Sequence, residues 1–130
     1  MSQENVEIAR KANDAFRRGD WVRIEATADP HVVVRTDSSW PEQYVYGRDT
    51  VMDWYRDGWE SLGPDVRIEE IIDLGDRVLV RNCWTVQGQQ SGFGGDLRWS
   101  EIITYRDERS VFIEMFRHHA EALKAVGLEE

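Results

Sequence analysis

One carboxylate of the chain occupies a position where an apolar side chain is expected. The segment RWSEIITY, residues 98–105, alternates as a β-strand does, and the face that carries Trp99 and Ile103 also carries Glu101. A carboxyl group among apolar side chains loses its hydration, which raises its pKa. Such a group can act as a general acid, as a general base or, when neutral, as a hydrogen-bond donor. We therefore predict that Glu101 is the catalytic residue of the chain.

Two further polar side chains share the inward faces of neighbouring predicted strands. Asn82 lies in VLVRNCWTV on the same face as Val80 and Trp84, and Arg117 ends VFIEMFR. Either group can orient a substrate oxygen. The alternatives remain open: Glu101 could reach water near a rim or form a structural ion pair with Arg117, and Asn82 could satisfy a buried polar partner.

The turn before the last strand decides which side chains face each other. A three-residue loop over 107–109 would pair Arg106 with Ser110, Glu101 with Met115, and Trp99 with Arg117. A slip of one residue would turn Glu101 outward. The faces assigned inward by alternation are Leu97, Trp99, Glu101, Ile103 and Tyr105 on one strand and Val111, Ile113, Met115 and Arg117 on the next.

Aromatic side chains are abundant, with six Trp in 130 residues. They either fill a core or line a cavity, and in a hollow fold the two roles overlap. The loop residues Trp40, Tyr44 and Tyr46 could cover a cavity mouth, whereas His118 and His119 are expected at the surface or at a helix start. The residues predicted to bind a ligand are Asn82, Arg117, Trp54, Tyr55, Trp84, Trp99, Ile103 and Met115.

The elements that would position these groups follow from hydrophobic period and turn signals. Helical spacing predicts three helices in the first half of the chain and a short one at its end. Between them the period changes to that of strands. The order predicts one α+β domain over residues 1–130, with a curved antiparallel sheet and helices on one of its faces. The predicted helices cover residues 4–18, 20–28, 48–62 and 120–128. The predicted strands cover 31–35, 65–74, 77–88, 96–106 and 110–117, and residues 36–47 are predicted to form a loop.

Composition argues against several classes of protein. The net charge of -9, from 16 basic and 25 acidic residues, disfavours nucleic-acid binding. No apolar run approaches the ~20 residues that span a bilayer. The N-terminus lacks a signal-peptide pattern and Cys83 is the single cysteine, so we expect a cytoplasmic protein.

No cofactor or metal is predicted. His31, His118 and His119 do not have zinc-ligand spacing. The glycine-rich segment GQQSGFGG joins two predicted strands rather than a strand and a helix, so a hairpin is favoured over a phosphate loop.

The opposite face of the sheet predicts a partner. Ile102, Phe112 and Phe116 point away from the predicted cavity, and no helix is left to cover them. We expect a homodimer packed sheet to sheet. The alternative is a monomer with three scattered exposed apolar residues.

These features together resemble the SnoaL-like family of the nuclear-transport-factor-like superfamily, which has a cystatin-type α+β barrel. The resemblance implies a cone-shaped barrel around a pocket that three N-terminal helices close, followed by a short C-terminal helix. It covers nearly the whole chain and is carried by AFRRGDW (15–21), DPHVVV (29–34), YGRDTVMDWYRDGW (46–59), IIDLGDRVLVR (71–81), TYRDERSV (104–111) and AEALKAVGL (120–128).

The family's known catalytic arrangements match only in part. An acid at the strand position of Glu101 is similar to that of ketosteroid isomerases, but their tyrosine and aspartate fall near Ala12 and Val34. Polyketide cyclases of the SnoaL type would need a histidine, for which His118 is the candidate. Epoxide hydrolases would need a second carboxylate beside Asn82 and Arg117. Scytalone dehydratases use paired histidines and tyrosines, for which Tyr55, Tyr105 and His118 are the candidates.

We therefore expect a cofactor-independent acid–base enzyme of cyclase, isomerase, dehydratase or epoxide-hydrolase type, acting on a small apolar metabolite. Two alternatives stay open. One is a non-catalytic binding domain for a hydrophobic ligand, and the other is a dimerisation module whose interior is filled by its own tryptophans.

Overall fold

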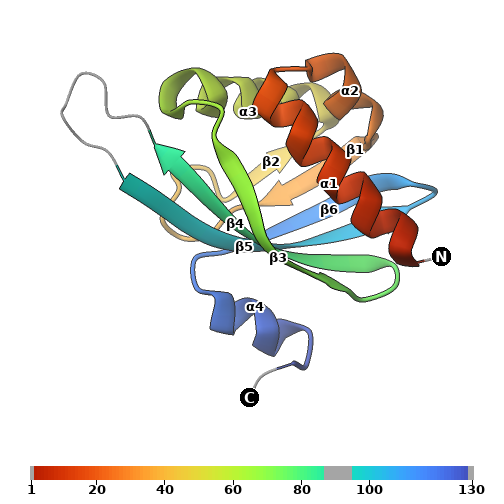
Figure 1. Cartoon of the computed structure of the whole chain (residues 1–130). Coiled ribbons are helices and arrows are strands. Elements are labelled where there is room, and N and C mark those ends of the chain that lie inside the picture. The colour runs from red at the N-terminus through yellow and green to blue at the C-terminus, as the bar shows by residue number, and fades with distance from the viewer. Residues whose placement is uncertain (1, 87–94, 129–130) are drawn as a thin grey trace.

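The structure is a computed structural model that describes residues 2–86 and 95–128. The helices α1 (Ser2–Arg18), α2 (Trp21–Ala26) and α3 (Arg48–Leu62) lie together on one side of a curved sheet, and α4 (His119–Ala125) lies on the other (Figure 1). This confirms the predicted α+β class. The strands are β1 (Ala28–Arg35), β2 (Tyr44–Tyr46), β3 (Val66–Asp73), β4 (Arg77–Val86), β5 (Gly95–Arg106) and β6 (Arg109–Phe116).

The six strands have the order β2-β1-β6-β5-β4-β3. The described ladders are antiparallel except that of β1 and β6, which is parallel. The prediction of a purely antiparallel sheet is wrong at this pair, because β1 and β6, which are separated along the chain by α3 and the strands β2 to β5, run in the same direction. β2 and β3 are edge strands, so the sheet is a curved, open cone rather than a closed barrel.

Two local predictions failed where the chain leaves the helices. β1 begins at Ala28, which was assigned to the short second helix, and that helix ends at Ala26. The predicted loop 36–47 contains the edge strand β2, whose pairing with β1 includes Val34 opposite Val45. A strand of this length has too little alternation to be detected beside Ser and Pro.

The helix boundaries follow the predicted signals. Gly19 has a φ of 68°, which a residue with a β-carbon adopts only at a cost, and it separates α1 from α2. Asp20 caps α2, because its Oδ1 accepts the backbone N–H of Arg23 at 3.3 Å. None of the helices in the described part of the chain is long and apolar enough to cross a membrane.

The main core lies between the concave side of the sheet and the helices. Val32, Val34 and Val78 are fully buried, and Val51 of α3 packs on them. The faces assigned from β4 and β5 are therefore correct. The inward residues that complete this cluster from the sheet are Val80, Ile103, Tyr105, Ile113 and Met115.

The hairpin between β5 and β6 is tighter than predicted. Arg106 pairs with Arg109, so the loop has two residues, Asp107 and Glu108, both with positive φ. A register shift next to Tyr105 then restores the predicted pairing of Glu101 with Met115. As a consequence, Ser110 lines the cavity in place of Val111.

The convex face is covered where no helix was expected. α4 packs there, with Ala122 and Ile102 almost completely buried and Phe116 partly buried against them. The premise that nothing covers Ile102 and Phe116 is therefore wrong, because the chain folds back under the sheet after β6. The dimer itself stays a prediction. The predicted turn GQQSGFGG lies, apart from Gly95, outside the described residues.

Candidate functional site

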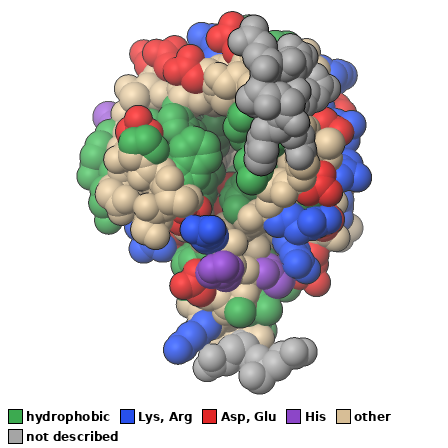
Figure 2. Space-filling model, turned by 90° about the vertical axis from the view of Figure 1, so that its left-hand side faces the viewer, with side chains coloured by type: hydrophobic (Ala, Val, Ile, Leu, Met, Phe, Trp, Pro, Cys, Tyr) green, Lys and Arg blue, Asp and Glu red, His purple; other side chains and the backbone are tan. Residues whose placement is uncertain are grey.

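A cavity of about 800 Å³ lies between the concave side of the sheet and the three N-terminal helices. Figure 2 shows it as a hollow whose visible sides are largely hydrophobic. It arises because the strands curve away from the helices while aromatic side chains hold the two layers apart. All eight residues predicted to bind a ligand line it, together with Glu101: Asn82, Arg117, Trp54, Tyr55, Trp84, Trp99, Ile103 and Met115.

Glu101 lies in the middle of β5 and faces this cavity. Its partners in the sheet are Val80 on β4 and Met115 on β6. The Nε1 of Trp99 donates a hydrogen bond to its Oε2 at 3.3 Å. The position of the carboxyl group therefore follows from the alternation of β5 and the register of both neighbouring strands.

The surroundings of Glu101 favour its neutral form. Desolvation raises the pKa of the carboxyl group above its ordinary value. Hydrogen bonds from Trp99 and Asn82 oppose the rise, because both stabilise the carboxylate, but they do not cancel it. The result is a carboxyl group that holds its proton more tightly than an exposed glutamate and keeps two donors beside it.

Two tyrosines share the cavity with this carboxyl group. Tyr55 of α3 and Tyr105 of β5 both line it, and burial raises the pKa of each hydroxyl, with a further rise from the charge of Glu101. Within the described residues, neither hydroxyl has a protein hydrogen-bond partner. Tyr55 was predicted as a wall residue and Tyr105 only as an inward one. The two hydroxyl groups share the cavity only because α3 packs on the sheet, and the spacing of residues in the sequence does not show how α3 packs.

Arg117 lies apart from Glu101. It follows the end of β6 and is exposed, although it borders the cavity. Among the ion pairs of the described residues there is none between the two side chains. The β5–β6 ladder ends at Ser100 and Phe116, so the expected pairing of Trp99 with Arg117 is not part of it. Arg117 is a rim residue.

The other aromatic candidates divide between wall and surface. Trp40 lines the cavity and packs edge-on against Trp54, with ring centroids 5.4 Å apart. Tyr44 and Tyr46 are exposed and stack on each other, because only Val45 of β2 points into the core. Of the three loop aromatics that could have covered the mouth, Trp40 lines the cavity and the two tyrosines do not.

Helix α1 supplies a wall that was not predicted. Ala9, Ala12, Asn13 and Phe16 line the cavity. Their spacing is that of one helical stripe, so the signal was present in the sequence. The uncharged amide of Asn13 is the polar group of this wall.

The histidines of the C-terminal segment do not reach the cavity. His119 lies on the convex side, where its Nδ1 is 2.7 Å from Oγ of buried Ser100 and its Nε2 is 2.8 Å from Oε1 of Glu70. These contacts attach α4 to β5 and β3. His118 is exposed at the start of α4.

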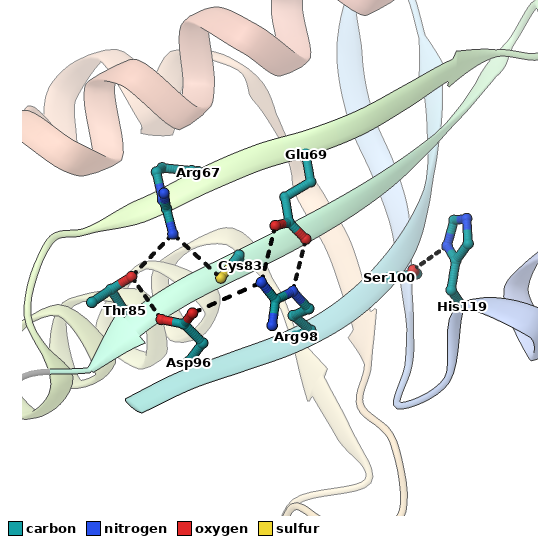
Figure 3. A network of polar contacts seen from close by, with 8 residues as sticks. All are labelled: Arg67, Glu69, Cys83, Thr85, Asp96, Arg98, Ser100 and His119. Carbon is teal, nitrogen blue, oxygen red and sulfur yellow. Dashed lines mark hydrogen bonds and ion pairs between the residues drawn. The ribbon is translucent and has the colours of Figure 1, made fainter. Parts of the chain in front are cut away.

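A polar network joins the strands on the same convex side (Figure 3). Arg98 contacts Glu69 through two nitrogens at 3.0 and 3.3 Å, and Asp96 at 3.8 Å. Thr85 donates to Asp96 and accepts from Arg67. These partners tie β3, β4 and β5 together, and Arg98 also borders the cavity.

No metal site is found in the part of the chain that the structure describes, since it holds no group of three His, Cys, Asp or Glu side chains suited to a metal ion. The polar groups at the cavity floor are a carboxyl, an amide and two phenols. These are groups that donate and accept protons or hydrogen bonds.

Comparison with known proteins assigns the family. A sequence profile of the SnoaL-like domain matches residues 9–113. The chain belongs to the SnoaL-like family. No curated protein matches this SnoaL-like domain significantly in sequence.

Solved structures resemble the SnoaL-like domain along its whole length. An NTF2-like protein of unknown function from Burkholderia pseudomallei is 22% identical with a TM-score of 0.76, covering 97% of this chain and 98% of its own. A protein from Jannaschia sp. CCS1, provisionally named a SnoaL-like polyketide cyclase, is 18% identical with a TM-score of 0.79 and coverages of 100% and 96%. TerC, co-crystallised with polyporic acid, is 20% identical with a TM-score of 0.74 and coverages of 95% and 98%. At these identities the likeness concerns the fold.

Proposed function

We propose that this SnoaL-like domain is a cofactor-independent enzyme that moves a proton on a small, largely apolar carbonyl compound. The observation that carries the proposal is the carboxyl group of Glu101 at the apolar floor of a cavity, with Trp99 and Asn82 as donors and two phenols nearby. A raised pKa brings a carboxyl group closer to the pH at which it can both take and return a proton.

The proposed step uses one acid–base group. The Glu101 carboxylate removes a proton from the carbon next to a substrate carbonyl, and the electron pair of that C–H bond moves to the carbonyl oxygen. Tyr55 and Tyr105, whose hydroxyls are free of protein partners in the described structure, donate hydrogen bonds to the resulting enolate. Protonated Glu101 then returns the proton to the same or another carbon, as in an isomerisation. Alternatively, the enolate carbon attacks a second carbonyl group of the same substrate and closes a ring, and Glu101 returns the proton to the alkoxide oxygen that forms.

The size and walls of the cavity support the substrate class. A volume of about 800 Å³ lies within the range of small-molecule sites. Indole and aliphatic side chains form most of the wall, which suits fused rings. One fold neighbour is named a polyketide cyclase, and TerC was co-crystallised with polyporic acid, so both agree with a ligand that contains rings.

The experiment that tests the proposal measures proton exchange directly. 1-Indanone in D₂O is incubated with the protein, and loss of the signal of the protons next to its carbonyl is followed by proton NMR. The wild type should accelerate exchange, and Glu101→Gln should lose roughly 100-fold or more of that acceleration, which is typical for a general base. Equal rates for the two proteins would contradict the proposal.

A non-catalytic carrier is the second candidate. It is favoured by one observation: the neighbours that hydrogen-bond to Glu101 are Trp99 and Asn82, neither of which titrates. A carrier would bind 1-indanone equally well as wild type and as Glu101→Gln, with no exchange in either. The dimerisation module with a filled interior has no support, since a cavity remains beside Trp54, Trp84 and Trp99.

A further inference from the structure

Gly58 lies inside α3 at the point where this helix passes over Trp84 of β4. A β-carbon built on Gly58 would lie 3.0 Å from Cη2 of Trp84, and 3.8 and 3.9 Å from Cζ3 and Cζ2. Glycine within a helix is unfavourable relative to alanine, so its presence there needs a packing reason. The close approach of the indole ring is that reason.

The ring of Trp84 is held at its other edge. Its Nε1 donates a hydrogen bond to the carbonyl oxygen of Gly63 at 3.0 Å, just beyond the end of α3. The atom nearest to that β-carbon is Cη2, at the outer end of the benzene ring and not in the five-membered ring that carries Nε1. A side chain at position 58 would therefore rotate the benzene edge away from α3 rather than move the whole ring.

The space into which the ring would move belongs to the cavity. Trp84 packs edge-on against Phe16, with ring centroids 5.9 Å apart, and in a tilted arrangement against Trp99, with centroids 5.8 Å apart. All three aromatic residues line the cavity. Trp99 is also the residue that donates to Glu101. Phe16, Trp84 and Trp99 thus form an aromatic end wall beside the carboxyl group.

We propose that Gly58 is a specificity-determining residue, which sets how long a fused-ring carbonyl compound can be and still reach Glu101. Because Gly58 has no side chain, the Trp84 ring can lie close to α3, and the aromatic end wall does not project further into the cavity. This inference rests on the proposed function, because it needs a ligand in the cavity. It adds that the length of the ligand is selected, and that Gly58 is the residue that selects it.

The test compares a shorter and a longer ketone, 1-indanone with two fused rings and anthrone with three, by equilibrium dialysis. Gly58→Ala should weaken anthrone binding at least tenfold and change 1-indanone binding less than twofold. Trp84→Phe removes the benzene edge, so in the double variant the anthrone loss should shrink to within threefold. Glu60→Ala, at an exposed position of the same helix, is the matched control and should change neither affinity. Equal losses for both ketones in Gly58→Ala would overturn the inference.

Ligand-free crystal structures of wild type and Gly58→Ala separate this inference from the proposed function. The ring of Trp84 should turn toward Phe16 and Trp99 and reduce the cavity volume. An unmoved ring with an unchanged cavity would overturn the inference even if both ketones bind. If neither ketone binds but the ring moves, the proposed function fails and the wall assignment stands. If Gly58→Ala does not fold, the single variant Trp84→Phe tests the assignment. It should then increase the affinity for anthrone more than the affinity for 1-indanone, and the absence of such a difference would overturn the inference.

Discussion

Trp99 and Glu101, two residues apart on β5, point into the same cavity, and the indole Nε1 of the first donates to Oε2 of the second at 3.3 Å. The donor is itself part of the apolar wall. One side chain therefore both removes water from the carboxyl group and partly replaces the hydration that is lost. These effects act on the pKa of Glu101 in opposite directions, with desolvation the larger.

Removing this donor should raise the pKa of Glu101 further. In Trp99→Phe the ring still excludes water, but the hydrogen bond that stabilises the carboxylate is gone. The side-chain carboxyl carbon of Glu101, followed by ¹³C NMR during a pH titration, reports the change. Trp21→Phe is the control and should leave the titration unchanged, because Trp21 packs on Phe16 and Trp59 and does not itself line the cavity. A lower pKa in Trp99→Phe would contradict the assigned role of the indole.

The raised pKa of Glu101 should also appear in the pH dependence of stability. The folded state binds the proton more tightly than the unfolded state, so this stability is fully present below the unfolded pKa and is lost as pH rises through the folded pKa. Each tenfold difference in proton affinity corresponds to about 1.4 kcal/mol. Glu101→Gln stays neutral, so the free energy of unfolding of wild type minus that of the variant should fall as pH increases from about 4. Urea unfolding across this range measures it, and parallel curves would refute the linkage.

The contact of His119 with Ser100 should stabilise the docking of α4. His119→Ala leaves the buried Ser100 hydroxyl without its partner, at a cost of about 1–3 kcal/mol. Adding Ser100→Ala should recover part of this loss, since the two residues are coupled. Urea unfolding and hydrogen exchange of the α4 amides measure both effects. The control is His118→Ala, because His118 is exposed and makes no side-chain cap bond. Strictly additive losses would show that the contact contributes nothing.

The β5–β6 turn offers a stabilising change. Asp107 and Glu108 have φ values of 52° and 65°, a region that glycine adopts without steric cost and that two-residue hairpins require. Glu108→Gly should increase the free energy of unfolding by about 1 kcal/mol. Glu108→Ala removes the same charge but keeps the β-carbon, so it should give no such gain. Stabilisation by alanine as strong as by glycine would mean that charge, and not backbone conformation, is responsible.

We propose that the homodimer expected from the sequence uses the part of the convex face that α4 leaves open. Val33 of β1 pairs with Tyr46 on one side and Phe112 on the other, which forms an apolar strip across three strands. Phe112→Asp should convert a dimer to a monomer in sedimentation equilibrium. Val22→Asp, at an isolated exposed position of α2, should not. A wild type that sediments as a monomer at every concentration would exclude this dimer.

The position of Glu101 could be predicted because strand alternation is a local property. The register that places it opposite Met115 was also correct, although the turn was predicted one residue too long, since the shift beside Tyr105 compensates. The placement of Asn82 followed from the same rule. Local patterning was sufficient for the faces of β4 and β5, whereas on β6 the shift beside Tyr105 brings Ser110 to the cavity in place of Val111.

The features that were missed depend on contacts between distant segments. The direction that the chain takes after Phe116 decides whether α4 covers Ile102, and helical periodicity does not encode it. The common position of Tyr55 and Tyr105 near Glu101 depends on how α3 docks. Val45 lies in a strand too short to show a period.

The parallel pairing of β1 with β6 has a consequence for biosynthesis. Val34 finds its ladder partner Ile113 only after α3 and the strands β2 to β5 between them have been translated. Until then the first strand has β2 on one edge and nothing on the other, and such an unpaired edge can recruit foreign strands. Contacts this far apart in sequence also slow folding, so β1 stays exposed to aggregation until β6 has emerged.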